Sequence, residues 1–506
     1  MGQPVRSELK ANVDYMQQQL GGNVDLIHRS FVCGETLGRE GVLFCLDVSA
    51  SGDQVAMLLR AATELTNPPY RRLQTAADPV ELFALTIAQL AEVRFAEDLD
   101  MAIDDILSGQ TAFFLEGSPR VLIADTRNPP RRGVEEPSTE SETRGPRDGF
   151  TEDVMTNLAL VRRRLRDPRL RAEPSVVGRR TKTDVVVLYL KDVAEPGLVA
   201  EVKKRLGRID VDSVMGTGYI EELIQDNPYS PFGALNYTER PDKLVGNLLE
   251  GRVGIMVDNS PFVLVVPTLF WHWLQAPGDY YNSFMVATAF RILRVLALLT
   301  ALLAPSLYTI LASFHHEMVP TPLALSMAAG REGTPLPTLI EVLALAVMFE
   351  IMHEAGLRLP RTVGQTVSIV GALVIGEAAV MAGLVSPATV IVVNAAGLSA
   401  FAIPFYAGSL SIRLIRIPLL LLSGTLGVFG FVAGTSFIAL HVASLRNFGQ
   451  PFLSPVAPLI KGDLKDTLVR APWWAMTWRP QLATTMTSRR QGPEVGKQAP
   501  PARGKR

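Results

Sequence analysis

The sequence predicts two fold classes in one chain: an α+β region and a membrane α-helical region. We expect a cytosolic two-subdomain α/β N-terminal region followed by a multi-pass transmembrane helical domain. Residues 295–314 are twenty without a charged group, 362–412 are fifty-one with only Glu377, and 417–445 are twenty-nine with none. A helix that crosses a bilayer needs about 20 mostly apolar residues. Because soluble helices keep a polar face, such runs are typical of an integral membrane protein.

The composition of the whole chain argues against several classes of protein. The 506 residues have a net charge of -1, so Lys and Arg show no excess of the kind that nucleic-acid binding requires. The two cysteines, Cys33 and Cys45, argue against a disulfide scaffold. The N-terminus is polar and carries no apolar stretch, which predicts no cleavable signal peptide. We therefore expect the N-terminal half to lie in the cytosol.

A polar N-terminal extension over 1–30 precedes a first α/β subdomain, which is expected over 31–125. Apolar residues predict a buried strand at 42–47. Two apolar runs, 112–115 and 121–124, with a Gly/Pro turn between them predict a hairpin. Apolar residues at helical spacing predict three helices, at 54–65, 79–90 and 98–107.

A linker rich in Pro, Gly, Ser, Thr, Arg and Glu occupies 126–149 and leads to a second α/β subdomain over 150–250. The elements predicted there are helices at 151–166, 196–206 and 219–225 and strands at 184–190 and 211–215. Gly216-Thr217-Gly218 lacks the Gly-Lys-Ser/Thr of a phosphate loop and is interpreted as a turn. The arginines of 162–166 suit the C-terminal end of a helix dipole. They form either a solvated face or a contact with an acidic partner or anionic lipid.

Residues 251–283 are predicted to touch the membrane interface. Two strands, 252–258 and 262–267, precede a group of aromatic residues that includes Trp271 and Trp273. Aromatic rings with one polar edge favour the headgroup zone. The transmembrane helical domain is expected over 284–446, with four to six segments. The apolar segments are 292–314, 338–356, 363–385, 387–410 and 417–445. The C-terminal region, 447–506, ends in a basic disordered tail.

Polar groups inside these segments are the candidates for a pore or polar path. They are Glu341, Glu350, His353, Glu354, Glu377 and Asn394. An ionisable group facing lipid is costly, so these groups are expected to face protein, water or the interface. Glu350, His353 and Glu354 share one helix face. The alternative for that segment is an amphipathic helix lying on the membrane with this face wet. Glu377 and Asn394 either bond across a helix contact or line a pore.

Small residues mark the candidate helix-packing positions, because they let helices approach closely. These positions are Gly376, Gly383, Gly430 and Gly434. Glu350-x-x-His353 is half of a di-metal carboxylate motif, but the second copy is missing, so neither metal nor cofactor is predicted. No nucleophile–base pair or phosphate loop stands out, so an enzyme is not predicted.

The number of membrane crossings stays open. The pairs Arg358 with Arg361 and Arg413 with Arg416 predict cytosolic loops. With a cytosolic N-terminal half, five crossings would place the C-terminus outside, whereas the basic tail favours the inside. The charged second segment is the candidate for not crossing, although that choice moves Arg358 and Arg361 to the other side.

Several long strings of residues resemble the spore germination GerA family. They are 144–152, 157–160, 238–242, 249–252, 331–337, 349–360 and 370–379. The match covers about residues 140–460, and 30–125 resemble the family's first subdomain more loosely. Strings 331–337 and 349–360 are closer to the family's A subunits than to the related SpoVAF-like proteins.

The resemblance implies the A subunit of a nutrient germinant receptor in the inner membrane of a bacterial endospore. It implies two partners, a transporter-like B subunit that senses the nutrient and a lipoprotein C subunit, and no nucleic acid. It further implies a homo-oligomer in membrane lipid that acts as a ligand-gated channel for monovalent cations. Two alternatives remain: a secondary transporter, although no internal repeat is visible, and a non-conducting membrane scaffold.

Overall fold

A computed structural model describes residues 3–33, 38–64, 79–128, 136–137, 139–140, 142–233, 235–358, 376–481 and 489–490. The chain forms two compact units, each described here by itself. The sheet unit comprises Met1–Ile224, Tyr237–Pro267 and Thr477–Arg506, and the helical unit comprises Gln225–Asn236 and Thr268–Met476.

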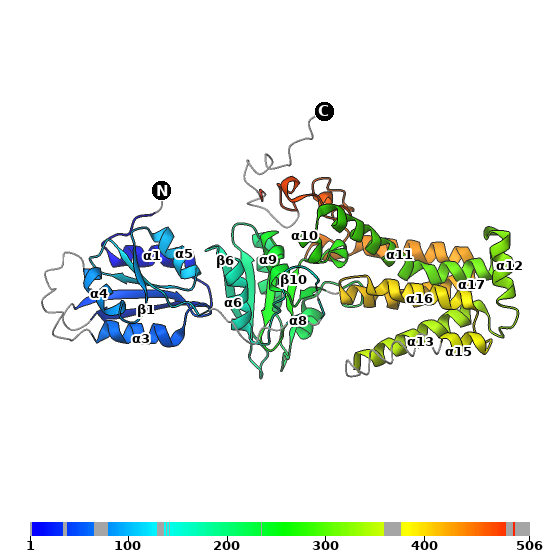
Figure 1. Ribbon diagram of the computed structural model, residues 1–506, viewed down its shortest axis with the longest axis horizontal. Coiled ribbons are helices and arrows are strands. Elements are labelled where there is room, and N and C mark those ends of the chain that lie inside the picture. The colour runs from blue at the N-terminus through cyan, green and yellow to red at the C-terminus, as the bar shows by residue number, and fades with distance from the viewer. Residues whose placement is uncertain are drawn as a thin grey trace, which may run out of the picture. The chain divides into compact units, whose positions relative to one another are not determined.

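The first subdomain of the sheet unit is a five-stranded sheet with helices on both faces (Figure 1). The strands are β1 (Leu26–Cys33), β2 (Arg39–Leu46), β3 (Val93–Ala96), β4 (Thr111–Leu115) and β5 (Val121–Ala124), in the order β1-β2-β4-β5-β3. The helices are α1 (Leu9–Leu20), α3 (Gly52–Thr63), α4 (Pro79–Ile87) and α5 (Leu99–Leu107). In β2, Val42 and Phe44 pack with α1 and α5, whereas Leu43 and Cys45 pack with α3 and α4. The alternation of the strand therefore builds two cores.

The second subdomain has the same layout. Its elements are α6 (Val154–Arg164), β6 (Leu170–Val177), β7 (Thr183–Leu190), α7 (Pro196–Leu206), α8 (Thr217–Ile224), β8 (Asn236–Thr238), α9 (Pro241–Leu249), β9 (Val253–Val257) and β10 (Val263–Val266). The sheet order is β6-β7-β9-β10-β8. Each sheet therefore contains two antiparallel hairpins, with the strand that precedes the second hairpin at the far edge. In the described residues the order of helices and strands along the chain is also the same.

The structure confirms several local predictions and corrects others. The predicted hairpin is β4 and β5, which pair antiparallel, and the strand predicted at 184–190 is β7. The strand predicted at 211–215 is wrong. That stretch is irregular, because its carbonyl groups accept hydrogen bonds from the turn after β6 instead of from a strand. The strands predicted at 252–258 and 262–267 are β9 and β10, so the second sheet extends past residue 250.

The helical unit is built on α11 (Phe284–Ser313), α13 (Thr338–Arg358), α16 (Pro387–Phe401) and α17 (Tyr406–Ser444). Shorter elements are η2 (Phe270–Leu274), α10 (Gly278–Tyr281), α12 (Thr321–Ala329) and α15 (Gly376–Met381). Helix α11 packs along α16 and α17, and α13 packs on α16 (Figure 1). By length and composition, α11 can cross a membrane. The 39 residues of α17 meet the same test but are interrupted at Gly427, and α16 is apolar but shorter. Most of the segment predicted at 363–385 lies outside the described residues.

Helix α17 is a hairpin of two helical arms, 406–426 and 428–444. Gly427 has φ 62° and ψ -141°, which interrupts the helix. A Cβ on Gly434 would lie 2.7 Å from Leu419, and one on Gly430 would lie 2.1 Å from the carbonyl oxygen of Leu422. In a straight helix, residues 419 and 434 would be about 22 Å apart at a rise of 1.5 Å per residue. The prediction of a single segment at 417–445 is therefore wrong, because the chain reverses at Gly427.

The aromatic segment before α11 is part of the interior of the helical unit. Trp273 is fully buried, and its ring stacks on Phe232 at a centroid distance of 5.9 Å. Phe405 and Phe452 complete the cluster, and Gly408 of α17 allows the close approach of the backbone to the indole. The side chain of Trp273 therefore does not reach a lipid headgroup.

Candidate functional site

The first candidate group is a buried carboxylate where three helices meet. Glu341 lies in the first turn of α13 and is fully buried. Its Oε2 accepts hydrogen bonds from the backbone N–H of Ser386 at 3.1 Å and from the hydroxyl of Thr389 at 2.9 Å. Ser386 caps α16, and Thr389 Oγ1 lies 3.1 Å from the hydroxyl of Tyr308 on α11. Glu341 therefore sits at the positive end of the α16 dipole and ties α13 to it.

The second group is an ion-pair cluster between α13 and the first arm of α17. Glu350 Oε1 accepts a hydrogen bond from Arg416 Nη2 at 3.1 Å, and its Oε2 lies 3.2 Å from Arg413 Nη1. The arginines are buried and the glutamate is 29% exposed. The sequence predicts these two arginines as loop residues, but both lie inside α17.

The other two residues of the predicted polar face of α13 have different surroundings. The ring of His353 lies 5.0 Å from that of Phe401, so this imidazole packs against α16. Glu354 is exposed and pairs with Arg358 at 2.6 Å, one turn further along the same helix. The face of α13 that carries Glu350, His353 and Glu354 therefore contains one buried cluster and one surface ion pair.

Glu377 and Asn394 both lie exposed on short apolar helices, α15 and α16. Within the described residues, neither shares a hydrogen bond or ion pair with Glu350 or Glu341. The structure therefore divides the six candidates into buried or paired groups and outward-facing groups.

The predicted packing glycines have unequal roles. Gly430 and Gly434 bring the two arms of α17 together. Gly383 has φ 66° and is a turn residue after α15, and a Cβ on Gly376 would make only ordinary contact with Val390. Two other glycines, which the sequence does not single out, allow closer approaches: a Cβ on Gly397 would lie 2.5 Å from Phe349, and one on Gly424 would lie 2.4 Å from Leu339.

A charged cluster near the start of α11 was also missed. Arg291 donates to Asp279 at 3.0 Å and to Asp466 at 2.7 Å, and Arg291 and Asp279 are almost fully buried. Arg294 also pairs with Asp279, at 2.7 Å. Two arginines one turn apart at the start of an apolar helix were the available signal, but their partner Asp466 is far away in the sequence.

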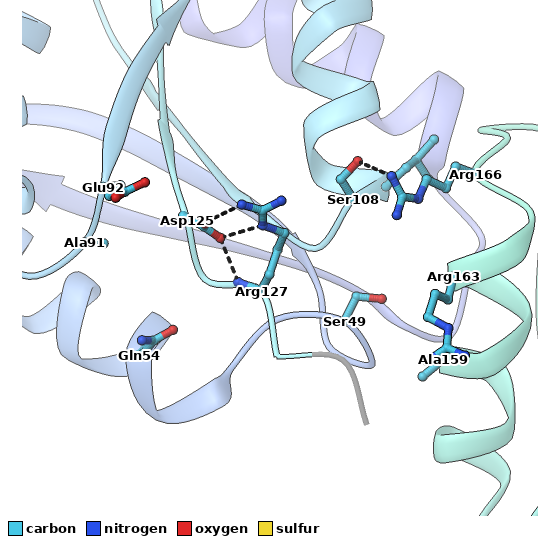
Figure 2. Close-up of a pocket in the computed structure, with 11 residues that line it drawn as sticks. Ser49, Gln54, Ala91, Glu92, Ser108, Asp125, Arg127, Ala159, Arg163 and Arg166 are labelled. Carbon is cyan, nitrogen blue, oxygen red and sulfur yellow. Dashed lines mark hydrogen bonds and ion pairs between the residues drawn. The ribbon is translucent and has the colours of Figure 1, made fainter. Parts of the chain in front are cut away.

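The sheet unit contains a cleft of about 680 Å³ between its two subdomains (Figure 2). Arg163 and Arg166, from α6 and the residues after it, face Ser49, Ser108 and the Asp125–Arg127 pair of the first subdomain. The hydrogen bond from Arg127 holds the pKa of Asp125 below its ordinary value. Charged and hydroxyl groups that converge on one cleft suit a small polar molecule.

Comparison with known proteins identifies relatives along the whole chain. The family model described as Bacillus/Clostridium GerA spore germination protein matches residues 14–482. The chain is 43% identical over 415 residues to spore germination protein KA of Bacillus subtilis (strain 168), which covers 82% of this chain and 76% of that protein. It is 35% identical over 473 residues to spore germination protein GerLA of Bacillus cereus, with coverages of 94% and 95%.

One solved structure is also similar in sequence. It is the crystal structure of the N-terminal domain of the A subunit of the Bacillus megaterium spore germinant receptor GerK3. That chain is 31% identical, the TM-score is 0.43, and the match covers 53% of this chain and 98% of that one.

Proposed function

Because this chain belongs to the GerA family of spore germination proteins, we propose that it is the A subunit of a nutrient germinant receptor. The proposed location is the inner membrane of the spore, with the helical unit in lipid and the sheet unit in the cytosol. The apolar helix α11, which is long enough to cross a membrane, and the two apolar arms of α17 support the placement in lipid. The proposed partners are a transporter-like B subunit and a lipoprotein C subunit.

The proposed activity is ion release through an oligomeric pore that opens when the nutrient is sensed. One observation carries this proposal: Glu377 and Asn394 lie exposed on apolar helices of the single chain. A carboxylate directed at lipid is costly, so this surface requires water or a neighbouring subunit. A ring of carboxylates contributed by several copies attracts cations, as in cation channels. Glu341 and Glu350, in contrast, hold the helices in place.

The test is reconstitution of the full-length protein into liposomes, alone and together with the B and C subunits. We expect a nutrient-dependent flux of monovalent cations and a particle mass that corresponds to several copies. Glu377→Gln should lower the flux several-fold. Glu317→Gln is the matched control, because it removes an exposed carboxylate outside the apolar segments and should leave the flux unchanged.

The outcome separates this proposal from its alternatives. An assembled complex that conducts no ions, yet restores germination, would identify a scaffold. Saturable uptake of labelled nutrient would identify a transporter. An unchanged flux in Glu377→Gln would remove this residue from the ion path.

A further inference from the structure

The cluster around Glu350 contains more positive charge than its one carboxylate neutralises. Arg413 and Arg416 are 5% and 1% exposed, and both pair with this carboxylate. The nearby Glu354 is exposed and bound by Arg358. The segment 359–375, which follows α13, contains neither Asp nor Glu. Among the residues that the structure describes, the two buried guanidinium groups therefore share one counter-ion.

Hydrogen-bond donors of both arginines are also unused. In the described residues, the Nε atoms of Arg413 and Arg416 and the Nη1 of Arg416 are buried without an acceptor. Arg413 Nη1 contacts Glu350 by charge but makes no hydrogen bond. Buried donors without acceptors are costly, and native structures contain few of them. The cluster therefore has hydrogen-bond donors to offer to a second anionic group.

The surroundings identify the class of that group. Leu414, which follows Arg413 in the chain, is 62% exposed, and Ile351, which follows Glu350, is 60% exposed, so both helices that carry the cluster also expose apolar side chains. The arginines also separate the nearly uncharged stretch 362–412 from the uncharged stretch 417–445. Cations at the border of an apolar surface match the depth of the phosphates in a bilayer.

We propose that Arg413 and Arg416, with Glu350 as their resident counter-ion, bind the phosphate group of an anionic phospholipid. A guanidinium group presents parallel N–H donors that fit two phosphate oxygens at once. The phosphate approaches from the side on which Glu350 is exposed, and its acyl chains lie along Ile351 and Leu414. The proposal depends on the placement of the helical unit in a membrane, but it does not depend on ion conduction.

Native mass spectrometry of the full-length protein in detergent tests the site, with phosphatidylglycerol and phosphatidylcholine as probes. We expect the wild type to retain phosphatidylglycerol about tenfold better, as charge-assisted hydrogen bonds imply. The double variant Arg413→Gln with Arg416→Gln should lose that preference. Arg358→Gln is the matched control. It removes an exposed arginine at the end of α13 and should leave the preference for phosphatidylglycerol unchanged. Equal retention of both lipids by the wild type, or an unchanged preference in the double variant, overturns the proposal.

Glu350→Gln provides a test in the opposite direction. Removing the resident counter-ion should raise the retention of phosphatidylglycerol several-fold, whereas a purely structural ion-pair cluster predicts no gain. If a folded Glu350→Gln protein retains no more phosphatidylglycerol than the wild type, the proposal is overturned.

Two further measurements separate the sources of phosphate and the two functions. If millimolar inorganic phosphate binds through the two arginines while phosphatidylglycerol shows no preference, the site takes free phosphate and the assignment to lipid is overturned. Cation flux is measured on the same preparations. In the wild type, equal retention of the two lipids together with intact flux rejects only the lipid site, whereas absent flux with an intact preference for phosphatidylglycerol rejects only conduction.

Discussion

Arg162 and Asp25 join the two subdomains of the sheet unit through a buried, bidentate ion pair. Arg162 Nε and Nη2 donate to the two carboxylate oxygens at 2.9 and 3.0 Å, and the two side chains are 1% and 0% exposed. The next residue of α6, Arg163, faces the cleft between the same subdomains (Figure 2). Adjacent residues of one helix thus fix the subdomains together and line the space between them.

Breaking this pair should destabilise the protein strongly. Asp25→Ala leaves the Arg162 guanidinium buried without its counter-ion, which costs about 3–5 kcal/mol. Glu64→Ala, which breaks an exposed pair with Arg60, should cost less than about 1 kcal/mol. Thermal unfolding of the full-length variants measures both effects. Equal shifts in Tm for the two variants would show that the subdomains do not depend on this pair.

The Asp125–Arg127 pair should contribute stability that depends on pH. Arg127 lowers the pKa of Asp125 in the folded state, so the stabilisation is fully present above the ordinary carboxyl value of about 3.9. It is lost as the pH falls through the lowered folded value. The Tm difference between wild type and Arg127→Gln should therefore be constant from pH 5 to 8 and shrink below about pH 4. A difference that grows on acidification would contradict this assignment.

Glu341 should cap α16 mainly by accepting hydrogen bonds, so its acceptor oxygen should matter more for stability than its negative charge. Glu341→Leu leaves the N–H of Ser386 without its acceptor, at about 1–3 kcal/mol, and removes one of the hydrogen-bond partners of the Thr389 hydroxyl. Glu341→Gln keeps an acceptor oxygen in place and should therefore lose less stability than Glu341→Leu. Thermal unfolding in detergent compares the two, with Glu354→Gln as an exposed control on the same helix. The assignment fails if the Gln and Leu variants are equally unstable.

The reversal of α17 can be tested by cross-linking. Leu419→Cys with Gly434→Cys should form a disulfide under mild oxidation, because the two positions are in contact across the hairpin. Leu421→Cys with Gly434→Cys is the control, since Leu421 is exposed and points to another side of the arm. Mass spectrometry of the oxidised protein detects the bond. A straight helix would give no bond in either variant.

The natural cysteines should not interfere with that experiment. Burial raises the pKa of the Cys33 thiol to about 12 and that of Cys45 to about 11. Since the thiolate is the reactive form, native protein at pH 8 should react with iodoacetamide at least about a hundredfold more slowly than unfolded protein. Rapid modification of the native protein would show that the first subdomain opens.

Local sequence patterns were sufficient to predict the elements in which apolar residues are continuous or recur at a regular spacing. The hairpin of β4 and β5 and the strand β7 appear where alternating or continuous apolar residues predict them. The same patterns failed at 211–215, where apolar residues pack as an irregular connection, and at Gly427, where one glycine reverses a helix without changing hydropathy. A moving average of hydropathy cannot detect a change in chain direction.

The sequence by itself determined which stretches are apolar enough for lipid and, through its long matching strings, the family. Tertiary structure alone decided the roles of the ionisable residues, because each role depends on a partner distant in sequence. Glu341 caps a helix whose N-cap lies 45 residues later, and Arg162 meets an aspartate 137 residues earlier. In the sequence, a single carboxylate within an apolar helix gives the same pattern whether it caps another helix, forms an ion pair or faces outward. The residues around it are determined only when the helices pack.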